Sequence, residues 1–261
     1  MKPFLSIITV NLNNYIGLKK TVQSVINQNF TDYEYIVIDG ASTDRSIDII
    51  ESYRKNIDII ISELDSGIYN AMNKGVKNAS GDFLLFLNSG DFFVSNTAVE
   101  DFVNHKDFKG DIIYGDYKFE NGEKIYPNKL TPFFFMKSSL PHQSTFIKKS
   151  IFKDMGNYNE SYSIASDREF FIKCFLSEKY QFKHINLSLT YFDLLGISNN
   201  PKYLNIKEKE DREILESNFG IYYKDYCRLL NLEKQINKFK RNTLKGLIKR
   251  IIAKIKIYAK A

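Results

Sequence analysis

Hydrophobic and polar positions follow two alternating patterns in the first half of the chain. Nearly unbroken apolar runs occur at residues 4–10, 35–38, 57–61 and 83–87. Runs of this length that end in turn residues are typical of strands buried on both faces of a parallel sheet. Between these runs, apolar residues recur every three or four positions over residues 17–28, 44–54 and 69–78. This alternation predicts right-handed βαβ units, and therefore an α/β fold with a mostly parallel central sheet and flanking helices.

The remainder of the chain is less regular. Further elements are predicted as strands at residues 111–119 and 184–192, a hairpin turn at residues 120–123 and a helix at residues 166–176. The aromatic cluster at residues 133–136 is interpreted as core packing rather than as the lining of an acceptor pocket. From residue 201 onward the pattern is helical and charged, so we expect one domain over residues 1–200 and a helical extension over residues 201–261.

Polar residues follow the predicted strands, at the edge where open α/β sheets bind their ligands. Thr9 and Asn11 close the first strand and Asp39 closes the second, Asp65 comes after the third, and Asp91 follows the fourth. A turn or a helix cap is the alternative for any one of them. For Asp39 and Asp91, which come after strongly apolar strands, we favour a functional role.

No glycine-rich phosphate loop is present. The sequence contains neither Gly-x-Gly-x-x-Gly nor a Walker motif, which argues against a dinucleotide site and against a P-loop. Without such a loop, a pyrophosphate requires another source of positive charge. A Mg²⁺ or Mn²⁺ ion held by Asp91 would supply it, because hard cations bind carboxylate and phosphate oxygens.

Charge is distributed unevenly along the chain. The net charge is +6, but residues 240–261 hold eight Lys and Arg and no acid, so the preceding residues sum to 6 − 8 = −2. The basic segment has apolar residues at helical spacing, which is typical of a cationic amphipathic helix on an anionic membrane surface. Packing against protein is the alternative. Because the charge is confined to this tail, we expect no binding of nucleic acid.

The sequence is typical of a cytoplasmic protein. Its first residues lack the pattern of a signal peptide, and no apolar run approaches the ~18–20 residues of a spanning helix. Cys174 and Cys227 lie in apolar surroundings and are interpreted as reduced thiols. Together with the basic tail, this predicts a peripheral location on the inner face of the cell membrane.

Four ordered segments resemble the successive motifs of family 2 glycosyltransferases. They are SIITVN at residues 6–11, VIDGASTD at residues 37–44, DSGIYNAMNKG at residues 65–75 and FLNSGD at residues 86–91. The resemblance covers residues 3–196 and implies the Rossmann-like GT-A fold with transfer by inversion. It also implies that residues 1–97 form the nucleotide-sugar-binding half and residues 98–200 the acceptor-binding half of the catalytic domain.

The resemblance implies roles for individual residues. Asp39 corresponds to the carboxylate that binds the nucleotide base, Asp65 to an acidic position near the base and ribose, and Asp91 to the metal-coordinating aspartate. The chain departs from the family pattern at Gly90, where another acid is often found, and at Asn88, which replaces a frequent aspartate. Contacts with the donor are expected from Thr9, Asn11, Asp39, Asp65, Asn73, Asn88 and Ser89.

A second signature is the segment ASDREF at residues 165–170, in which Asp167 corresponds to the family's general base. An acceptor hydroxyl needs such a carboxylate to take its proton as it attacks the anomeric carbon. A helix N-cap is the alternative for Asp167, and Arg168 is expected in a surface ion pair. His142 and Gln143 resemble a recurrent segment that could contact diphosphate, metal or acceptor, with a structural role as the alternative for His142.

These observations predict an inverting, metal-dependent glycosyltransferase. It would move a sugar from a nucleotide-diphosphate donor, most often UDP in this family, to a saccharide acceptor that we expect to be lipid-linked, in surface polysaccharide assembly. A nucleotidyltransferase on a similar sheet is one alternative, although it should carry a glycine-rich basic loop after the first strand. The other is a non-catalytic, membrane-associated module that binds nucleotide-sugars.

Overall fold

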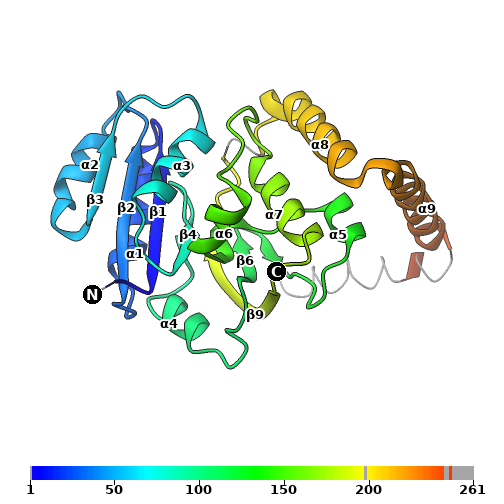
Figure 1. Ribbon diagram of the computed structural model, residues 1–261, viewed down its shortest axis with the longest axis horizontal. Coiled ribbons are helices and arrows are strands. Elements are labelled where there is room, and N and C mark those ends of the chain that lie inside the picture. The colour runs from blue at the N-terminus through cyan, green and yellow to red at the C-terminus, as the bar shows by residue number, and fades with distance from the viewer. Residues whose placement is uncertain (1, 197–198, 244–246, 249–261) are drawn as a thin grey trace.

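The computed structural model describes residues 2–196, 199–243 and 247–248 (Figure 1). Over these residues a nine-stranded sheet has the order β3–β2–β1–β4–β8–β6–β9–β5, with β7 paired to β6. The strands are β1 (Leu5–Asn11), β2 (Tyr33–Asp39), β3 (Ile59–Ser62), β4 (Phe83–Phe86), β5 (Phe92–Phe93), β6 (Ile112–Phe119), β7 (Gly122–Lys124), β8 (Thr145–Lys148) and β9 (Phe182–Tyr191).

The first half of the sheet is parallel, which confirms the prediction from the apolar runs. β1 pairs in parallel with β2 and β4, and β2 pairs in parallel with β3. Along β1, Leu5 and Ile7 belong to one hydrophobic core, whereas Ile8 and Val10 belong to the other. The strand is therefore buried on both faces, which explains its nearly unbroken apolar sequence.

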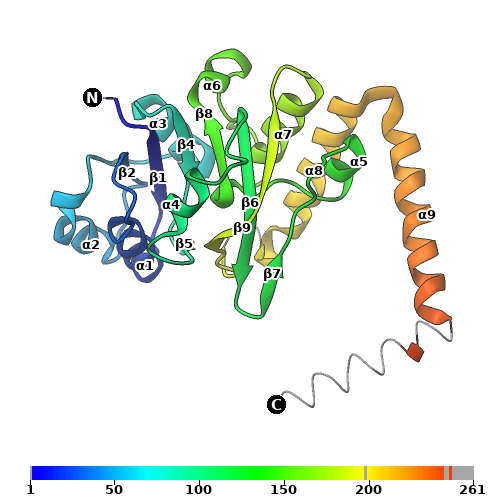
Figure 2. The same ribbon diagram turned by 90° about the horizontal axis from the view of Figure 1, so that it is seen from below.

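Helices cover both faces of the sheet (Figures 1 and 2). The core on one face includes side chains from α1 (Tyr15–Ile26), α2 (Ser46–Ser52) and α4 (Ala98–Val103). The core on the other face includes side chains from α3 (Ile68–Asn78), α5 (Pro132–Lys137), α6 (Lys149–Met155), α7 (Ser166–Leu176) and α8 (Leu204–Phe219). The molecule is thus a three-layered α/β structure, as the alternation of strands and helices predicts.

The second half of the sheet is mixed. β8 is antiparallel to β4 and β6, whereas β6 and β9 are parallel and β5 is antiparallel to β9. The predicted strands at residues 111–119 and 184–192 correspond to β6 and β9, and the predicted turn joins β6 to β7. β5 has only two residues, and β8 has only two apolar residues, Phe146 and Ile147, among its four, so neither strand stands out in a hydrophobic pattern.

The C-terminal extension is helical over its described part, as predicted. Ile214 and Phe219 of α8 are buried in the core, so this helix is integrated with the catalytic domain. The next helix, α9 (Tyr223–Asn242), meets α5 through Tyr226 and then extends away from the sheet (Figure 2). Most of the basic segment lies outside the described residues. No helix in the described part of the chain is long and apolar enough to cross a membrane.

Several local expectations are confirmed. Phe135 and Met136 are buried in the core, so the aromatic cluster at residues 133–136 serves packing. Cys174 is buried, Cys227 is half-buried, and both are free thiols.

Candidate active site

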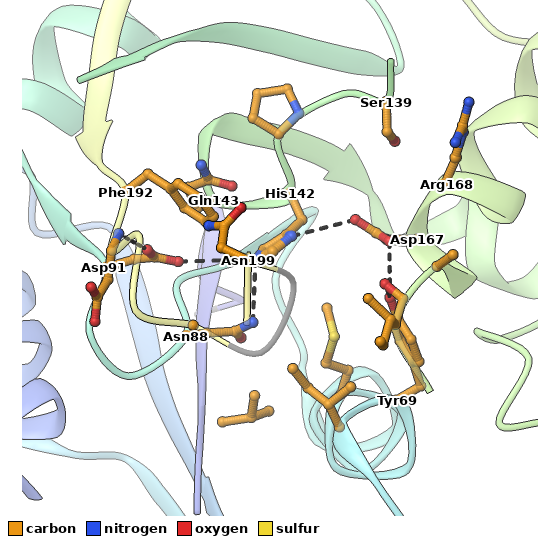
Figure 3. Close-up of a pocket in the computed structure, with 18 of the residues that line it drawn as sticks. Tyr69, Asn88, Asp91, Ser139, His142, Gln143, Asp167, Arg168, Phe192 and Asn199 are labelled. Carbon is orange, nitrogen blue, oxygen red and sulfur yellow. Dashed lines mark hydrogen bonds and ion pairs between the residues drawn. The ribbon is translucent and has the colours of Figure 1, made fainter. Parts of the chain in front are cut away.

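A cavity of about 890 Å³ lies between the carboxyl ends of the parallel strands and the loops of the second half (Figure 3). Most of the residues singled out by sequence line it: Asn11, Asp65, Asn88, Ser89, Asp91, His142, Gln143 and Asp167. Such a crevice beyond the strand ends is where an open α/β sheet binds ligands. The structure therefore brings together residues from five segments that are far apart in the chain.

Asp39 does not line this cavity. Its carboxylate is fully buried and accepts hydrogen bonds from Asn11 Nδ2 at 2.8 Å, Ser42 N at 2.9 Å, Ser42 Oγ at 2.6 Å and Ser62 Oγ at 2.9 Å. These contacts join β1, β3 and the loop after β2. A buried carboxylate with four donors is well satisfied, so Asp39 shapes this part of the molecule, and base binding stays a prediction.

Thr9 and Asn73 also lie outside the cavity lining. Thr9 is fully buried, and its hydroxyl donates to the carbonyl of Leu87 at 2.8 Å. Asn73 accepts the N–H of Tyr158 at 3.0 Å and donates to the Tyr158 carbonyl at 2.9 Å. The first contact fixes β1 against β4, and the second fixes α3 against the loop after α6. Both residues act as scaffold here, and their predicted donor contacts stay predictions.

Asp167, His142 and Asp91 form a chain across the cavity (Figure 3). His142 Nδ1 lies 3.4 Å from Asp167 Oδ2, and His142 Nε2 lies 4.0 Å from Asp91 Oδ2. The Tyr69 hydroxyl donates to Asp167 Oδ1 at 2.9 Å. Asn88 Nδ2 lies 3.2 Å from His142 Nε2. One imidazole thus connects two carboxylates that come from different halves of the sheet.

Burial and neighbouring charges shift the pKa values of these three groups in different directions. Burial raises the pKa of Asp91 to about 7, against the opposing effect of the nearby His142. Burial alone would lower the pKa of His142, but its contact with Asp167 and the charges of both carboxylates raise that pKa. For Asp167, burial is outweighed by His142 and Tyr69, so its pKa is lowered. Asp167 is therefore ionised at neutral pH and able to accept a proton.

The position of Asp167 excludes its alternative role as a helix cap. It is the second residue of α7, whose N-cap is Ala165 without a side-chain hydrogen bond. The backbone before it is held by Glu210 of α8, which is buried and accepts the N–H groups of Ser163, Ile164 and Ala165 at 2.6, 2.9 and 3.0 Å. The C-terminal extension therefore fixes the segment that carries Asp167.

Arg168 forms an ion pair, as expected, but the pair does not lie at the surface. The Arg168 side chain is only 12% exposed, pairs with Asp211 of α8 and donates to the Phe135 carbonyl at 2.6 Å. The sequence pattern could not reveal this, because the partner comes from a helix that follows in the chain by some forty residues. Arg168 lines the cavity instead.

A carboxylate that the sequence analysis missed lies beside Asp91. The N–H of Asp193 donates to Asp91 Oδ1 at 2.9 Å, and the charge of Asp193 opposes ionisation of Asp91. Gly90 has φ +112°, and a Cβ built there would lie 2.6 Å from Asp193 Oδ2. Asp193 therefore occupies the space beside Gly90, where family members often have another acid. Asp193 comes shortly after the strand predicted at residues 184–192, so the rule that polar residues beyond strand ends reach the site could have found it.

The donor set fits a divalent cation. Within the described residues, no group of three or more His, Cys, Asp or Glu side chains is arranged to hold a metal on its own. Asp91 and Asp193 nevertheless offer neighbouring carboxylates, and Asn88 Oδ1 is buried without a hydrogen-bond partner among the described residues. Oxygens of this kind suit Mg²⁺ or Mn²⁺, with diphosphate oxygens completing the ligands.

The chain matches the sequence profile described as Glycosyl transferase family 2 over residues 6–179. It belongs to glycosyltransferase family 2. The PGL/p-HBAD biosynthesis glycosyltransferase of Mycobacterium bovis is 31% identical over 209 residues, which cover 76% of this chain and 80% of that protein. The putative teichuronic acid biosynthesis glycosyltransferase TuaG of Bacillus subtilis is 37% identical over 93 residues, 34% of this chain and 37% of TuaG. Family membership sets aside the alternative of a nucleotidyltransferase.

Solved structures confirm that this family 2 glycosyltransferase has the GT-A fold. TarS 1-349 of S. aureus in complex with UDP-GlcNAc gives a TM-score of 0.67 at 19% identity, covering 82% of this chain and 65% of that chain. This glycosyltransferase thus spans less than two thirds of that TarS chain. The mannosyltransferase PcManGT of Pyrobaculum calidifontis, in complex with GDP-Man and Mn²⁺, gives 0.56 at 11% identity, covering 100% and 81%. At these identities the likeness concerns the fold.

Proposed function

We propose that this glycosyltransferase moves a sugar from a nucleotide-diphosphate donor to a hydroxyl of a saccharide acceptor, with inversion at the anomeric carbon. The observation that carries the proposal is the placement of Asp167 in the cavity, ionised and opposite the Asp91–Asp193 pair. One base on the acceptor side and one site for the departing diphosphate suffice for a single displacement. UDP is our favoured nucleotide, supported by the TarS complex with UDP-GlcNAc.

In the proposed mechanism, Asp167 acts on the acceptor. As the acceptor oxygen forms its bond to the anomeric carbon, its proton passes to a carboxylate oxygen of Asp167. The bond between the anomeric carbon and the diphosphate oxygen breaks, and its electron pair leaves with the diphosphate. Tyr69 holds Asp167 Oδ1 through its hydroxyl, and His142 holds Oδ2, so the carboxylate has a fixed orientation.

Asp91 and Asp193, with Asn88 Oδ1, would hold the divalent cation that we propose. When bound, this ion supplies positive charge that stabilises the leaving diphosphate. His142 adds a positive charge when it is protonated, and it lies between that site and the base. The PcManGT complex with GDP-Man and Mn²⁺ supports a metal in this fold.

We infer a lipid-linked saccharide acceptor and a role in surface polysaccharide assembly. The names of the relatives support this setting, since one acts in PGL/p-HBAD biosynthesis and TuaG in teichuronic acid biosynthesis. Glycosyl transfer itself is testable by incubating the protein with UDP-sugars, Mn²⁺ and candidate acceptors, and by determining the anomeric configuration of the product by NMR. A product that retains the donor configuration would contradict the single displacement, and failure to bind any nucleotide in a calorimetric titration would contradict the donor site.

We also infer that the C-terminal extension contacts the inner face of the cell membrane. The described part of α9 exposes Leu229, Leu232, Ile236 and Phe239, which recur at helical spacing, and the basic segment follows directly. An apolar stripe next to clustered cations suits anionic lipid. The full chain should sediment with vesicles rich in phosphatidylglycerol and not with pure phosphatidylcholine, and Ile236→Ser/Phe239→Ser should weaken this. Leu64→Ser, which changes an exposed leucine of the parallel half, is the control.

A further inference from the structure

Gln143 is a buried amide that makes no hydrogen bond through its side chain within the described part of the chain. It is 2% exposed and lines the cavity from the short turn His142–Ser144. Gln28, which is also buried, is paired instead: its Nε2 donates to the carbonyls of Ser24 at 3.1 Å and Ser95 at 2.7 Å, and its Oε1 accepts a backbone N–H at 3.1 Å. Because buried polar groups nearly always have a hydrogen-bond partner, the Gln143 amide is available to a ligand in the cavity.

The turn that carries Gln143 is fixed to the strands beside Asp91. The hydroxyl groups of Ser144 and of Thr190 in β9 are hydrogen-bonded to each other at 2.7 Å, and both residues are fully buried. Thr190 is paired with Phe93 of β5, the strand that begins directly after Asp91. A polar group on a turn that is anchored in this way is positioned before a ligand binds, which favours specific recognition.

The same turn places Gln143 near the proposed site of the diphosphate. His142, the residue before it, has its Nε2 atom 4.0 Å from Asp91 Oδ2. In Figure 3, Gln143 lies on the Asp91 side of His142, and Asp167 lies on the other side. The sugar of a nucleotide-diphosphate donor is bonded to that diphosphate. We therefore expect the donor sugar, rather than the attacking acceptor, beside the Gln143 amide.

A primary amide is suited to the hydroxyl groups of a sugar. Its N–H groups donate to a hydroxyl oxygen, and its carbonyl oxygen accepts from a hydroxyl. The amide carries no net charge, whereas a diphosphate is bound most strongly by cations. A site whose polar groups pair with a ligand hydroxyl discriminates against a ligand without it, because those groups are then left unpaired.

We propose that Gln143 determines which donor sugar this glycosyltransferase accepts, by hydrogen bonding to one or two hydroxyl groups of that sugar. The inference rests on the proposed glycosyl transfer and adds a specificity-determining residue to it. It assigns Gln143 to the donor sugar instead of to the diphosphate, the metal or the acceptor. A donor that lacks the hydroxyl groups facing the amide would leave the amide unpaired and would bind weakly.

Calorimetric titrations of the full chain test this assignment. The ligands are UDP, UDP-glucose, UDP-galactose and UDP-N-acetylglucosamine, in Mn²⁺ and without acceptor. Gln143→Met keeps the size of the side chain and removes the amide. Its affinity for the sugar nucleotide that the wild type binds most tightly should fall by about three- to tenfold, whereas its affinity for UDP should stay within about twofold. Gln181→Met, the same change at an exposed position, should bind all four ligands like the wild type.

Urea unfolding of the ligand-free protein separates sugar recognition from a structural role. Gln143→Met removes an amide that has no partner among the described residues, so the urea midpoint should stay unchanged or rise. Gln28→Met should lower the midpoint, because two carbonyls and one N–H lose their partner. A fall in Gln143→Met as large as that in Gln28→Met would overturn the inference, since the amide would then support the fold.

The binding outcomes also separate the inference from the proposed function. An equal loss of affinity for UDP and for the sugar nucleotides in Gln143→Met would overturn the inference, since the amide would then bind the nucleotide or the diphosphate. Unchanged affinity for all four ligands would overturn it as well. Failure of the wild type to bind UDP or any of its sugar conjugates would instead contradict the UDP donor of the proposed function.

Discussion

The two halves of the sheet supply the site in different ways. In the parallel half, Asn88 and Asp91 reach the cavity because they follow the end of β4, and Asp65 because it follows β3. In the mixed half, His142 lies on a short turn before β8 and Asp167 on the first turn of α7. Strand ends thus place the groups that we propose for the donor side, and loops with helix starts place those that we propose for the acceptor side.

Within the parallel half, polar residues that hold the protein together also differ from polar residues that remain available to a ligand. Asp39 has four hydrogen-bond donors from the protein, and Asn73 spans α3 and the loop after α6. Asn88 Oδ1, in contrast, has no partner among the described residues, and Asp91 has a pKa raised to about 7. Polar groups left unsatisfied or destabilised in a cavity are those available to a ligand. This is our basis for ranking Asp91 above Asp39 as a ligand-binding residue.

The largest effect is expected from Asp167→Asn. If Asp167 of the mixed half takes the proton of the acceptor hydroxyl, this change should lower kcat by about 10²–10⁴-fold, because the general base is lost. Affinity for UDP should stay within about twofold of the wild type, since the donor side is untouched. Initial-rate kinetics and calorimetric titration measure the two quantities. Asp154→Asn, an exposed carboxylate of the same half, is the matched control. If affinity for UDP falls together with kcat, Asp167 also contributes to donor binding, which would contradict the proposed division of roles between the two halves of the sheet.

Much of the parallel half could be predicted from the sequence. Its strands are buried on both faces, so the apolar runs mark them, and the residues that follow them must lie at one edge of the sheet. The same rule extends to Asp193 after β9. The mixed half does not follow these rules, because β5 and β8 each hold only two apolar residues and because its geometry depends on distant partners. Tyr69 and Asp167 are in contact although they are 98 residues apart.

A second prediction concerns how the raised pKa of Asp91 changes the free energy of unfolding with pH. Burial raises the pKa of Asp91 from 3.8 in the unfolded chain to about 7 in the folded protein. Relative to Asp91→Asn, the wild type should lose stability as pH rises from about 4 to 7 and then level off, because only the unfolded chain is fully ionised in that window. The difference should reach on the order of 2–4 kcal/mol.

Urea unfolding in EDTA between pH 4 and pH 9 measures this difference. The stability of Asp154→Asn should follow that of the wild type at every pH, since its carboxylate is exposed. A constant difference between the wild type and Asp91→Asn across the whole range would show that Asp91 does not titrate near neutral pH. It would also contradict the inference that burial destabilises the ionised form of the Asp91 carboxylate.

The third prediction tests whether the mixed half contributes to the donor side. Asp193→Asn should weaken Mn²⁺ binding in the presence of UDP by about 10–100-fold if Asp193 replaces the acid that is missing at Gly90. Electron paramagnetic resonance of free and bound Mn²⁺ reports this affinity without any turnover. UDP binding without metal should not change. Equal Mn²⁺ affinity in the variant and the wild type would leave Asp91 as the sole carboxylate ligand.

The smallest effect is expected at Glu210, which links α8 to the segment before Asp167. Glu210→Gln replaces one acceptor oxygen by an amide that faces backbone N–H groups, so one or two donors of residues 163–165 become unsatisfied. We expect a loss of about 1–2 kcal/mol in the free energy of unfolding and a reduced kcat with unchanged UDP affinity. Glu208→Gln, on the exposed face of the same helix, should behave like the wild type. If Glu210→Gln lowers stability without lowering kcat, the extension supports the fold but does not position the base.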